Sequence, residues 1–516
     1  MRNKNIIPDI PAEKFKLVGV DAKLHDRKFE TKQISYFRDA FNRFCKNKSS
    51  VVAAIIILCL VLYAIVVPIF CQTSYSKSLT DTNYLNYTKL APKSQLFKNL
   101  GLGILDGTKS MKLSEANLNY YKAIGVETGT EAVVRVTDTS TDKTGKVSYQ
   151  ADVDTYIANG FMFATLSQSQ YEDIMAWQME TGIQVIYPAV DYTGKKLVDA
   201  NVWYKSNQKN VATLDKNGNF ANVYKTSGND GGYNSLRVPG DPGIEDPNSP
   251  DRYRYATITG DSSSVSYNCR LFKYNYFQYK YGFEPAFFLG TNGMGQDILT
   301  RLAAGAQFSL LFAVIIACIN LTIGAIYGAI EGYYGGTVDL LMERFTDILA
   351  RVPFIVVATL FQLHLAKKVG PIWSLLFAFV LTGWIGMAST VRMQFYRFKG
   401  QEYVLAARTL GASDGRLMFK HIFPNALGTI VTSSVLVIPG VIFSESSLTY
   451  LGIVNLDSST MTSVGTMLAN GRQYLQSDPH IILFPALFIS LLEISFNLFG
   501  NGLRDAFNPA LRGSDE

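Results

Sequence analysis

One short stretch has the residue types of a phosphate-binding loop without their spacing. Residues 103–110, GILDGTKS, contain a Gly, a Lys and a Ser, as do loops that cradle nucleotide phosphates. That chemistry needs the order G-x-x-x-x-G-K-[ST], in which the second Gly directly precedes the Lys. Thr108 separates Gly107 from Lys109 here. The stretch is therefore not predicted to bind a nucleotide.

Other residues that could hold metals or perform catalysis are sparse. The sequence DKNGN at 215–219 offers oxygen ligands. It lacks a Gly at the sixth position of a calcium loop and the Glu that closes such a loop, so it predicts a hairpin turn. The five Cys follow no metal or disulfide spacing. The four His all lie outside residues 72–286, so a His-dependent hydrolase is not indicated there. They are His25, His364, His421 and His480.

Two carboxylates, Glu445 and Glu493, lie inside long apolar stretches. Ionisable groups are costly in a membrane interior and are often functional there. Either side chain could line a translocation path, and Glu493 could also pair with another subunit. A structural polar contact between helices remains the alternative for both residues.

The segment 402–426, EYVLAARTLGASDGRLMFKHIFPNA, is a polar interruption between two apolar stretches. Helix formers fill its first part, and Gly411 suits the left-handed turn beyond a helix end. Ser413 is a good N-cap for a second short helix, with Asp414 favourable beside it. Pro424 is expected to end that second helix.

This helix–Gly–helix unit has the properties of a docking element. Ala406 and Ala407 have very small side chains, so another protein surface could approach the backbone closely. We interpret the unit as a contact that transmits force between a soluble partner and a membrane bundle. A helical hairpin lying on the membrane surface is the alternative.

The elements that position these residues are membrane spans. The 516 residues are 48% apolar, with a net charge of +6 and a mean hydropathy of +0.10. This balance favours membrane spans combined with a sizeable soluble part, and the charge is too small to indicate nucleic-acid binding. A bilayer core of about 30 Å requires roughly 20 apolar residues in a helix. Six stretches are interpreted as spans: 50–71, 308–330, 354–366, 372–389, 426–453 and 481–503.

Charge predicts the orientation of these spans. Basic residues precede the first span and recur around the 402–426 segment, so both termini and this segment are expected in the cytoplasm. Lys367 and Lys368, on an external turn, run against this rule. Before the first span, apolar residues at helical spacing predict an amphipathic helix on the inner membrane surface, with a plain basic flank as the alternative. They are Ile34, Phe37, Phe41 and Phe44.

Residues 72–286 have a different composition, rich in Tyr, Asn, Thr, Ser, Gly and Asp. Alternating stretches at 131–138, 202–206 and 253–259 predict strands. The stretch 166–182 predicts one helix that ends at Gly182. With about 200 residues this segment can bury its own core. An α+β extracellular domain with a Pro/Gly-rich loop at 238–251 is expected.

The 402–426 segment resembles the coupling loop of ABC-transporter permeases, written roughly E-A-A-x-x-x-G-x(9)-I-x-L-P. Four residues fall in register: Ala406, Ala407, Gly411 and Pro424. Three positions differ from this general form: Leu405, His421 and Phe423. The sequence A-A-R-x-L-G-A-S-D followed by H-I-F-P-N is similar to the form used by the peptide-transporter branch. Further stretches that resemble that branch are 36–48, 287–310, 332–353, 443–453 and 496–509.

The resemblance covers residues 33–71 and 287–512 and implies a fold and a function. The fold would be an α-helical polytopic permease of six transmembrane helices, of the type I importer kind. It would carry a large α+β insertion between helices 1 and 2. The expected segments are 1–49 (cytoplasmic tail with amphipathic helix), 50–71 (first span), 72–286 (insertion), 287–512 (permease core with the coupling loop 393–425) and 513–516 (C-terminal tail).

Peptide import by alternating access is the activity that the resemblance implies, without enzymatic activity in this chain. The implied partners are two cytoplasmic ATPase subunits, which bind ATP and Mg, a second homologous permease, an extracellular solute-binding protein, the lipid bilayer and a peptide. No cofactor is expected on this chain. The residues expected to contact the ATPase are Tyr403, Ala406, Ala407, Arg408, Gly411, Ala412, Ser413, Asp414 and Phe419.

Three alternatives concern the solute and the insertion. Similar permeases carry nickel complexes or other small solutes, so the solute is not fixed by the sequence. The insertion could dock the binding protein or cover the outer mouth of the bundle. It could also be a sensor or adhesion module to which transport is secondary.

Overall fold

The structure is a computed structural model, and it describes part of the chain. The described residues are 36–70, 86–95, 97, 105–143, 145–189, 200–201, 204–205, 210–211, 234–235, 254–260, 265–456 and 461–507. The predicted turn at 215–219, the predicted loop at 238–251 and Cys71 lie outside these residues.

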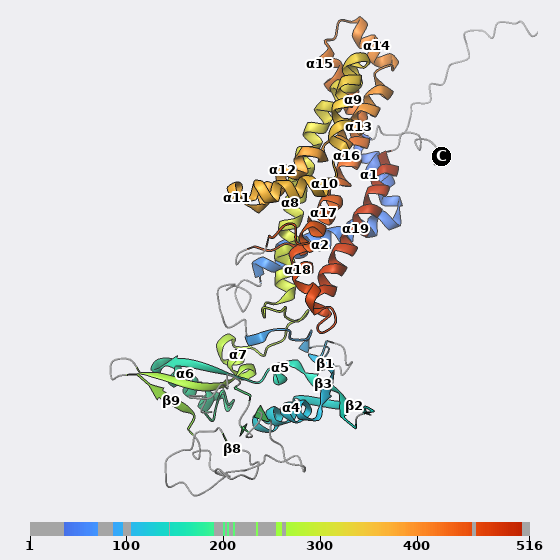
Figure 1. Ribbon diagram of the computed structural model, residues 1–516. Helices are drawn as coiled ribbons and strands as arrows, with labels where there is room; N and C mark the ends of the chain where they lie inside the picture. The colour runs from blue at the N-terminus through green and yellow to red at the C-terminus, as the bar shows by residue number, and fades with distance from the viewer. Residues whose placement is uncertain are drawn as a thin grey trace, which may run out of the picture.

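Long apolar helices form a bundle, and the insertion lies beyond one of its ends (Figure 1). Five helices are long and apolar enough to cross a membrane, or six if the pair α9 and α10, bent by 70°, is one span. The helices of the bundle are α2 (Lys48–Phe70), α8 (Ile298–Tyr334), α9 (Gly336–Ala350), α10 (Phe354–His364), α11 (Ala366–Val369), α12 (Pro371–Gly383), α13 (Ile385–Phe398), α16 (Phe423–Val435), α17 (Val437–Tyr450), α18 (Val464–Gly471) and α19 (His480–Phe507).

The prediction that Pro424 ends a helix is wrong. The helix α15 (Asp414–Arg416) continues through the π-helix η5 (Leu417–Ile422) into α16, and together with α17 they form one candidate span, Asp414–Tyr450. Pro424 occupies the first turn of α16. The change of hydrogen-bond register in the π-helical turn accommodates a residue that has no backbone N–H. The helix that contains this span therefore begins at Asp414, earlier than the sequence indicated.

The amphipathic helix expected before the first span is α1 (Tyr36–Lys46). Its small, buried Ala40 and its Phe44 pack against the end of α19, where Phe44 meets Phe499 edge to face at 5.3 Å between ring centroids. Phe41 is exposed and lines a shallow hollow together with Phe44 and Phe499. The interpretation as a helix is confirmed, while its position on the inner membrane surface stays a prediction.

The helices α8 and α13 pack closely against each other. Gly324, Gly328 and Gly332 lie four residues apart on one face of α8. A Cβ on Gly328 would lie 2.2 Å from the carbonyl oxygen of Ala388, and one on Gly332 would lie 2.7 Å from that of Arg392. The two backbones touch here because glycine has no side chain, which is the usual way for membrane helices to pack tightly.

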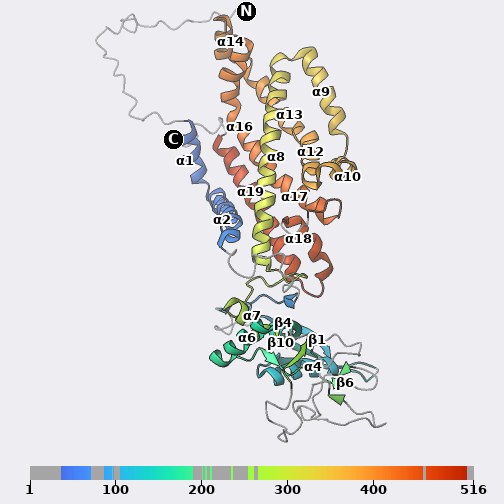
Figure 2. The same cartoon turned by 90° about the vertical axis from the view of Figure 1, so that its left-hand side faces the viewer.

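The insertion consists of small antiparallel sheets with helices beside them (Figure 2). The sheets have the strand orders β1-β3-β2, β4-β10-β5 with β9 paired to β10, and β7-β6-β8. Its strands are β1 (Thr108–Ser114), β2 (Val133–Thr141), β3 (Val147–Asp154), β4 (Phe161–Ser167), β5 (Ile186–Tyr187), β6 (Tyr204–Lys205), β7 (Asn210–Val211), β8 (Asn234–Ser235), β9 (Ala256–Thr259) and β10 (Ser266–Phe272). Its helices are α4 (Glu115–Thr128), α5 (Thr155–Ala158), α6 (Gln168–Thr181) and α7 (Lys273–Tyr281).

Several local predictions for the insertion are confirmed. The helix expected at 166–182 is α6, which begins after the N-cap Ser167 and ends at Gly182 in the left-handed conformation. Strands β2, β6 and β9 fall within or overlap the three stretches predicted as strands. The core includes Arg270, fully buried, whose guanidinium donates to both carboxylate oxygens of Glu127 at 2.8 Å. This paired charge explains how an arginine can lie in the interior.

The insertion joins the bundle through two adjacent chain segments. The Lys93 N–H donates to the Phe287 carbonyl at 2.7 Å, so the chain entering the insertion lies beside the chain leaving it. Buried Thr291 accepts a hydrogen bond from the Leu90 N–H at 2.8 Å and donates one to the Tyr87 carbonyl at 2.6 Å. The Phe287 N–H also donates to the Tyr156 hydroxyl. These contacts lie just before α8.

A second attachment reaches the segment between α18 and α19. The ammonium group of Lys109, on β1, lies 2.6 Å from the carboxylate of Asp478, whose side chain is only 3% exposed. The ammonium group of Lys89 lies 4.7 Å from the centre of the Tyr474 ring. The insertion therefore contacts two segments of the bundle that are far apart in the sequence, and His480 Nε2 lies 3.4 Å from the Thr291 carbonyl between them.

We predict that Gly328→Ala destabilises the protein. The added Cβ would overlap the Ala388 carbonyl, and overpacking of this kind costs about 1–3 kcal/mol. The matched control is Gly386→Ala on α13, where a Cβ meets no described atom within 4 Å. The measurement is the thermal unfolding midpoint of the detergent-solubilised protein. Equal midpoints for both variants would contradict the close α8–α13 packing.

Candidate functional site

The helix–Gly–helix unit lies at the end of the bundle farthest from the insertion (Figure 2). Its first helix is α14 (Glu402–Thr409), which follows α13 after a three-residue connection. Its second helix begins at α15 and continues into the span. We call the residues 402–419 the tip.

Gly411 makes the turn between the two helices. Its φ is +83°, a conformation that residues with a side chain rarely adopt, and its N–H donates to the Arg408 carbonyl at 3.0 Å. Ser413 then has the extended backbone of an N-cap, although its side chain makes no capping hydrogen bond. The left-handed turn predicted from the sequence is confirmed.

The residues expected to contact an ATPase lie together on the surface of the tip. Seven of them are exposed: Tyr403, Ala406, Arg408, Gly411, Ser413, Asp414 and Phe419. Ala407 and Ala412 are half-buried. Partial burial of the Tyr403 hydroxyl raises its pKa above the ordinary value. The structure thus gathers all nine residues at one end of the molecule, and their contact with an ATPase stays a prediction.

The opposite face of the tip is anchored in a hydrophobic cluster. Val404 of α14 and Leu417 and Ile422 of η5 are fully buried. They pack with residues of α8 and α13, which include Tyr333 and Phe395. Because apolar burial stabilises this contact along its length, the tip is part of the bundle and not a free hairpin.

A polar contact reinforces this anchor. The Tyr333 hydroxyl, at the end of α8, donates to the Asp414 carboxylate at 2.6 Å. The Arg408 guanidinium donates to the same hydroxyl at 3.2 Å. One side chain of α8 therefore bridges α14 and α15 across the Gly411 turn.

The sequence did not indicate Tyr333 as a residue of this site. Tyr333 is 81 positions before Asp414, and no local pattern pairs residues so far apart. Leu410 is 88% exposed at the tip.

Glu445 is fully buried in α17 and surrounded by hydroxyl groups. Its carboxylate accepts hydrogen bonds from Ser309 at 3.2 Å, Thr449 at 3.2 Å and Ser446 at 3.4 Å. Ser309 belongs to α8, so these bonds connect two helices. This arrangement favours the structural alternative for Glu445.

Glu493 has a different environment in α19. It is half-buried, and its Oε1 has no hydrogen-bond partner among the residues that the structure describes. The exposed Leu491 and Ile494 flank it on the same helix. Among the described residues, the groups that contact the Glu445 carboxylate do not include Glu493, and the role of both residues in a translocation path stays a prediction.

Among the described residues, no group of three or more His, Cys, Asp or Glu side chains could hold a metal ion. The near-motif at 103–110 also has no phosphate-binding geometry in its described part, because Thr108–Ser114 form the strand β1. A P-loop would instead lead into a helix.

Two family models match the chain. Residues 320–513 match the binding-protein-dependent transport system inner membrane component, and residues 35–92 match the N-terminal TM domain of oligopeptide transport permease C. The insertion between the first span and α8 lies almost entirely outside both matches.

Curated relatives agree with these matches. The chain is 43% identical over 223 residues to the oligopeptide transport system permease protein OppC of Bacillus subtilis, which covers 43% of this chain and 72% of the relative. It is 39% identical over 224 residues to the dipeptide transport system permease protein DppC of the same species, covering 43% of this chain and 68% of the relative. A solved methionine ABC transporter, MetNI, is 15% identical over 40% of this chain and 96% of its own, with a TM-score of 0.34, which is too low to support an argument.

The sequence identity extends over more than two thirds of each relative, and the matched residues include the spans and the tip. The chain therefore belongs to the family of binding-protein-dependent transport system inner membrane components, within its oligopeptide and dipeptide permease branch.

Proposed function

We propose that this chain is the permease subunit of an ATP-driven importer that moves oligopeptides or dipeptides across the cytoplasmic membrane by alternating access. The names of the relatives support peptides as the solute. The five or six candidate spans support a route through the membrane. Nickel or another small solute is not favoured, because the first relatives are peptide permeases.

The tip faces the cytoplasm and the insertion faces outward in this proposal. Basic residues gather near the tip, as the positive-inside rule expects of a cytoplasmic segment. They are Arg392, Arg397, Lys399, Arg408, Arg416 and Lys420. Both chain termini are then cytoplasmic, and the insertion, residues 72–286, is extracellular.

The observation that carries the proposal is the tip itself, exposed on one face and anchored on the other. We propose that one of two ATPase subunits, each using ATP and Mg, binds the exposed face. A second homologous permease completes the pathway, and an extracellular solute-binding protein delivers the peptide. This chain binds no cofactor of its own in the proposed complex.

Force on the tip has a direct route into the bundle. Closure of the ATPases displaces α14 and α15, which are linked to the end of α8 through Tyr333. The helix α8 then shifts with α13 because their backbones are in contact. A movement of this kind selects between two arrangements of the bundle, one open inward and one open outward.

The insertion would dock the solute-binding protein or cover the outer mouth. Two attachments to the bundle, at Thr291 and at Asp478, support a fixed position over the outer end. A sensor or adhesion module to which transport is secondary is not favoured, because the membrane part matches the permease relatives.

We predict that Gly411→Val lowers ATP-driven peptide uptake by at least about fivefold. A β-branched residue is strained at φ of +83°, so the turn moves and α14 separates from α15. The control is Gly411→Asn, which tolerates the left-handed conformation and should retain most uptake. Peptide capture by the binding protein should be unchanged in both variants. Full uptake by Gly411→Val would contradict the proposed role of the tip.

We predict that Glu445→Gln retains most peptide uptake and that Glu445→Leu destabilises the protein by about 1–3 kcal/mol. Gln offers an oxygen to the surrounding hydroxyl groups, which can also rotate to accept from its amide, whereas Leu leaves them unsatisfied. Thermal unfolding and uptake are measured for both variants. Loss of uptake by a stable Glu445→Gln protein would indicate instead that the charge contacts the solute.

We predict that removing the insertion abolishes association with the binding protein and peptide uptake together. The Gln95 side chain donates to the Glu284 carboxylate at 2.6 Å, so a short Gly/Ser linker can replace residues 96–283. Membrane insertion and ATPase binding are the controls, because the tip is at the other end. Uptake at the level of the unchanged protein would favour a separate module.

A further inference from the structure

The corner between α8 and α9 is unusually tight. The helix α8 ends at Tyr334 and α9 begins at Gly336, so only Gly335 separates them. Gly335 and Gly336 have φ values of +66° and +57°, which allow the chain to reverse without a loop. The helix α9 therefore runs back from the end of the bundle at which the tip lies (Figure 2).

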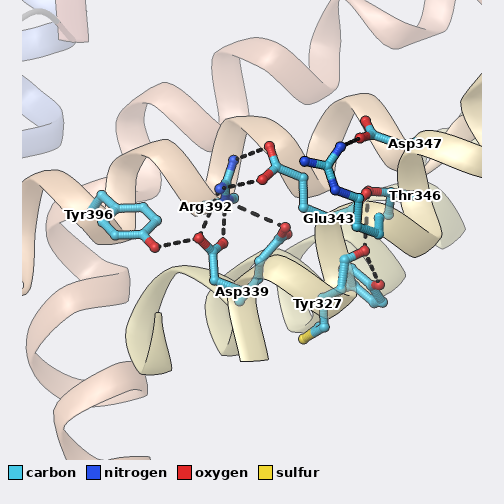
Figure 3. Close-up of polar contacts among 10 residues, drawn as sticks. Tyr327, Asp339, Glu343, Thr346, Asp347, Arg392 and Tyr396 are labelled. Carbon is cyan, nitrogen blue, oxygen red and sulfur yellow. Dashed lines mark hydrogen bonds and ion pairs between the residues drawn. The ribbon is translucent and has the colours of Figure 1, made fainter. Parts of the chain in front are cut away.

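Arg392 of α13 connects this corner to the rest of the bundle (Figure 3). Its guanidinium donates two hydrogen bonds to the Asp339 carboxylate, at 2.6 and 2.9 Å, and two to the Glu343 carboxylate, at 3.0 and 3.1 Å. Both carboxylates belong to α9. Forked pairs of this kind fix direction as well as distance, and an ammonium group cannot reproduce them.

Other charged and polar groups near Arg392 also contribute to this corner. The carboxylate of Glu331, buried near the end of α8, lies 3.4 Å from the guanidinium. The Tyr396 hydroxyl donates to Asp339 at 2.7 Å. The Lys399 ammonium donates to the Gly332 carbonyl at 2.9 Å and lies over the Tyr396 ring. Three carboxylates thus share one guanidinium, and they would repel one another without it.

Arg392 is well placed to fix the position of α9 against the bundle, because α9 has few other contacts with it. Most of the apolar side chains of α9 are exposed, including Leu341 and Ile348. Among the residues of this helix, only Thr346 is buried. A second polar contact comes from the Tyr327 hydroxyl, which donates to the Met342 carbonyl at 2.9 Å. The side chain of Arg392 is 22% exposed, so solvent screens its ion pairs only partly.

The same arginine is close to the tip along the chain. It lies on α13, which ends at Phe398 and leads into α14 at Glu402. On the other side, Glu331 is two residues from Tyr333, which holds Arg408 and Asp414 of the tip. The helices α8 and α13 both connect to the tip, and we call them the helices that bear the tip. They meet the helix α9 at Arg392.

We propose that Arg392 is a positioning residue for transport, which clamps α9 to the helices that bear the tip. When the tip moves, the clamp carries α9 with it and changes the 70° bend between α9 and α10. This inference rests on the proposed function. No residue of the clamp touches the solute, and its effect appears in how ATP hydrolysis is converted into import.

The test is the number of peptides imported per ATP hydrolysed, measured with the complete transporter in proteoliposomes. The change is Arg392→Gln, which removes the charge and the forked pairs. The matched control is Arg344→Gln on α9, whose arginine is 69% exposed and pairs with Asp347 of the same helix at 3.2 Å. We expect the ratio to fall at least about fivefold for Arg392→Gln and to stay unchanged for Arg344→Gln.

Further variants keep the test decisive if Arg392→Gln does not assemble. Arg392→Lys keeps the charge and loses the forks, and Asp339→Asn removes one partner with little change in volume. Each should lower the ratio by less than Arg392→Gln. A double variant of Arg392→Gln and Asp339→Asn should be no worse than Arg392→Gln alone, because both act through one contact.

The outcomes separate the two proposals. Absence of ATP-driven peptide uptake by the unchanged complex would overturn the proposed function. If the unchanged complex imports peptide and the assembled variants of Arg392 and Asp339 keep the same ratio, only the clamp is overturned. A ratio that falls equally for Arg344→Gln would also overturn it, since any loss of charge on α9 would then suffice.

Discussion

The contact between α8 and α13 is the constraint on which the other features depend. Lipid tails are as apolar as leucine, so the hydrophobic effect does little to draw helices together inside a bilayer. Three glycines on one face of α8 let the two backbones touch, because glycine has no side chain to keep them apart. Only with these helices in contact can Tyr333 reach the tip and Arg392 reach α9.

One helix then connects the two ends of the molecule. With 37 residues, α8 is about 55 Å long. It begins beside Thr291, where the insertion is attached, and it ends at Tyr334, beside the Tyr333 hydroxyl that bridges the tip. A displacement along this helix therefore reaches both ends, although the described part of the insertion lies at the opposite end of the bundle from the tip.

The sequence predicts what depends on local patterns and misses what depends on the register between distant helices. Hydropathy locates the spans, and the residues Ser167 and Gly182 mark both ends of α6. The turn at Gly411 follows from its residue type. Pro424 misled the prediction because a π-helical turn compensates for it, and such turns have no simple sequence signature. The partners of Tyr333 and Arg392 depend on how α8, α9 and α13 pack, which no local pattern encodes.

The two attachments of the insertion limit where the bundle can move. Contacts at Thr291 tie the insertion to the start of α8, and the pair Lys109–Asp478 ties it to the segment before α19. The Asp478 carboxylate is almost fully buried, so separating it from its partner would leave a charge in a poorly solvated place. The ends of α8 and α19 that lie near the insertion are thus both attached to it. A rearrangement of the bundle meets less resistance at α9 and α10, where the span is already bent and the apolar side chains are largely exposed.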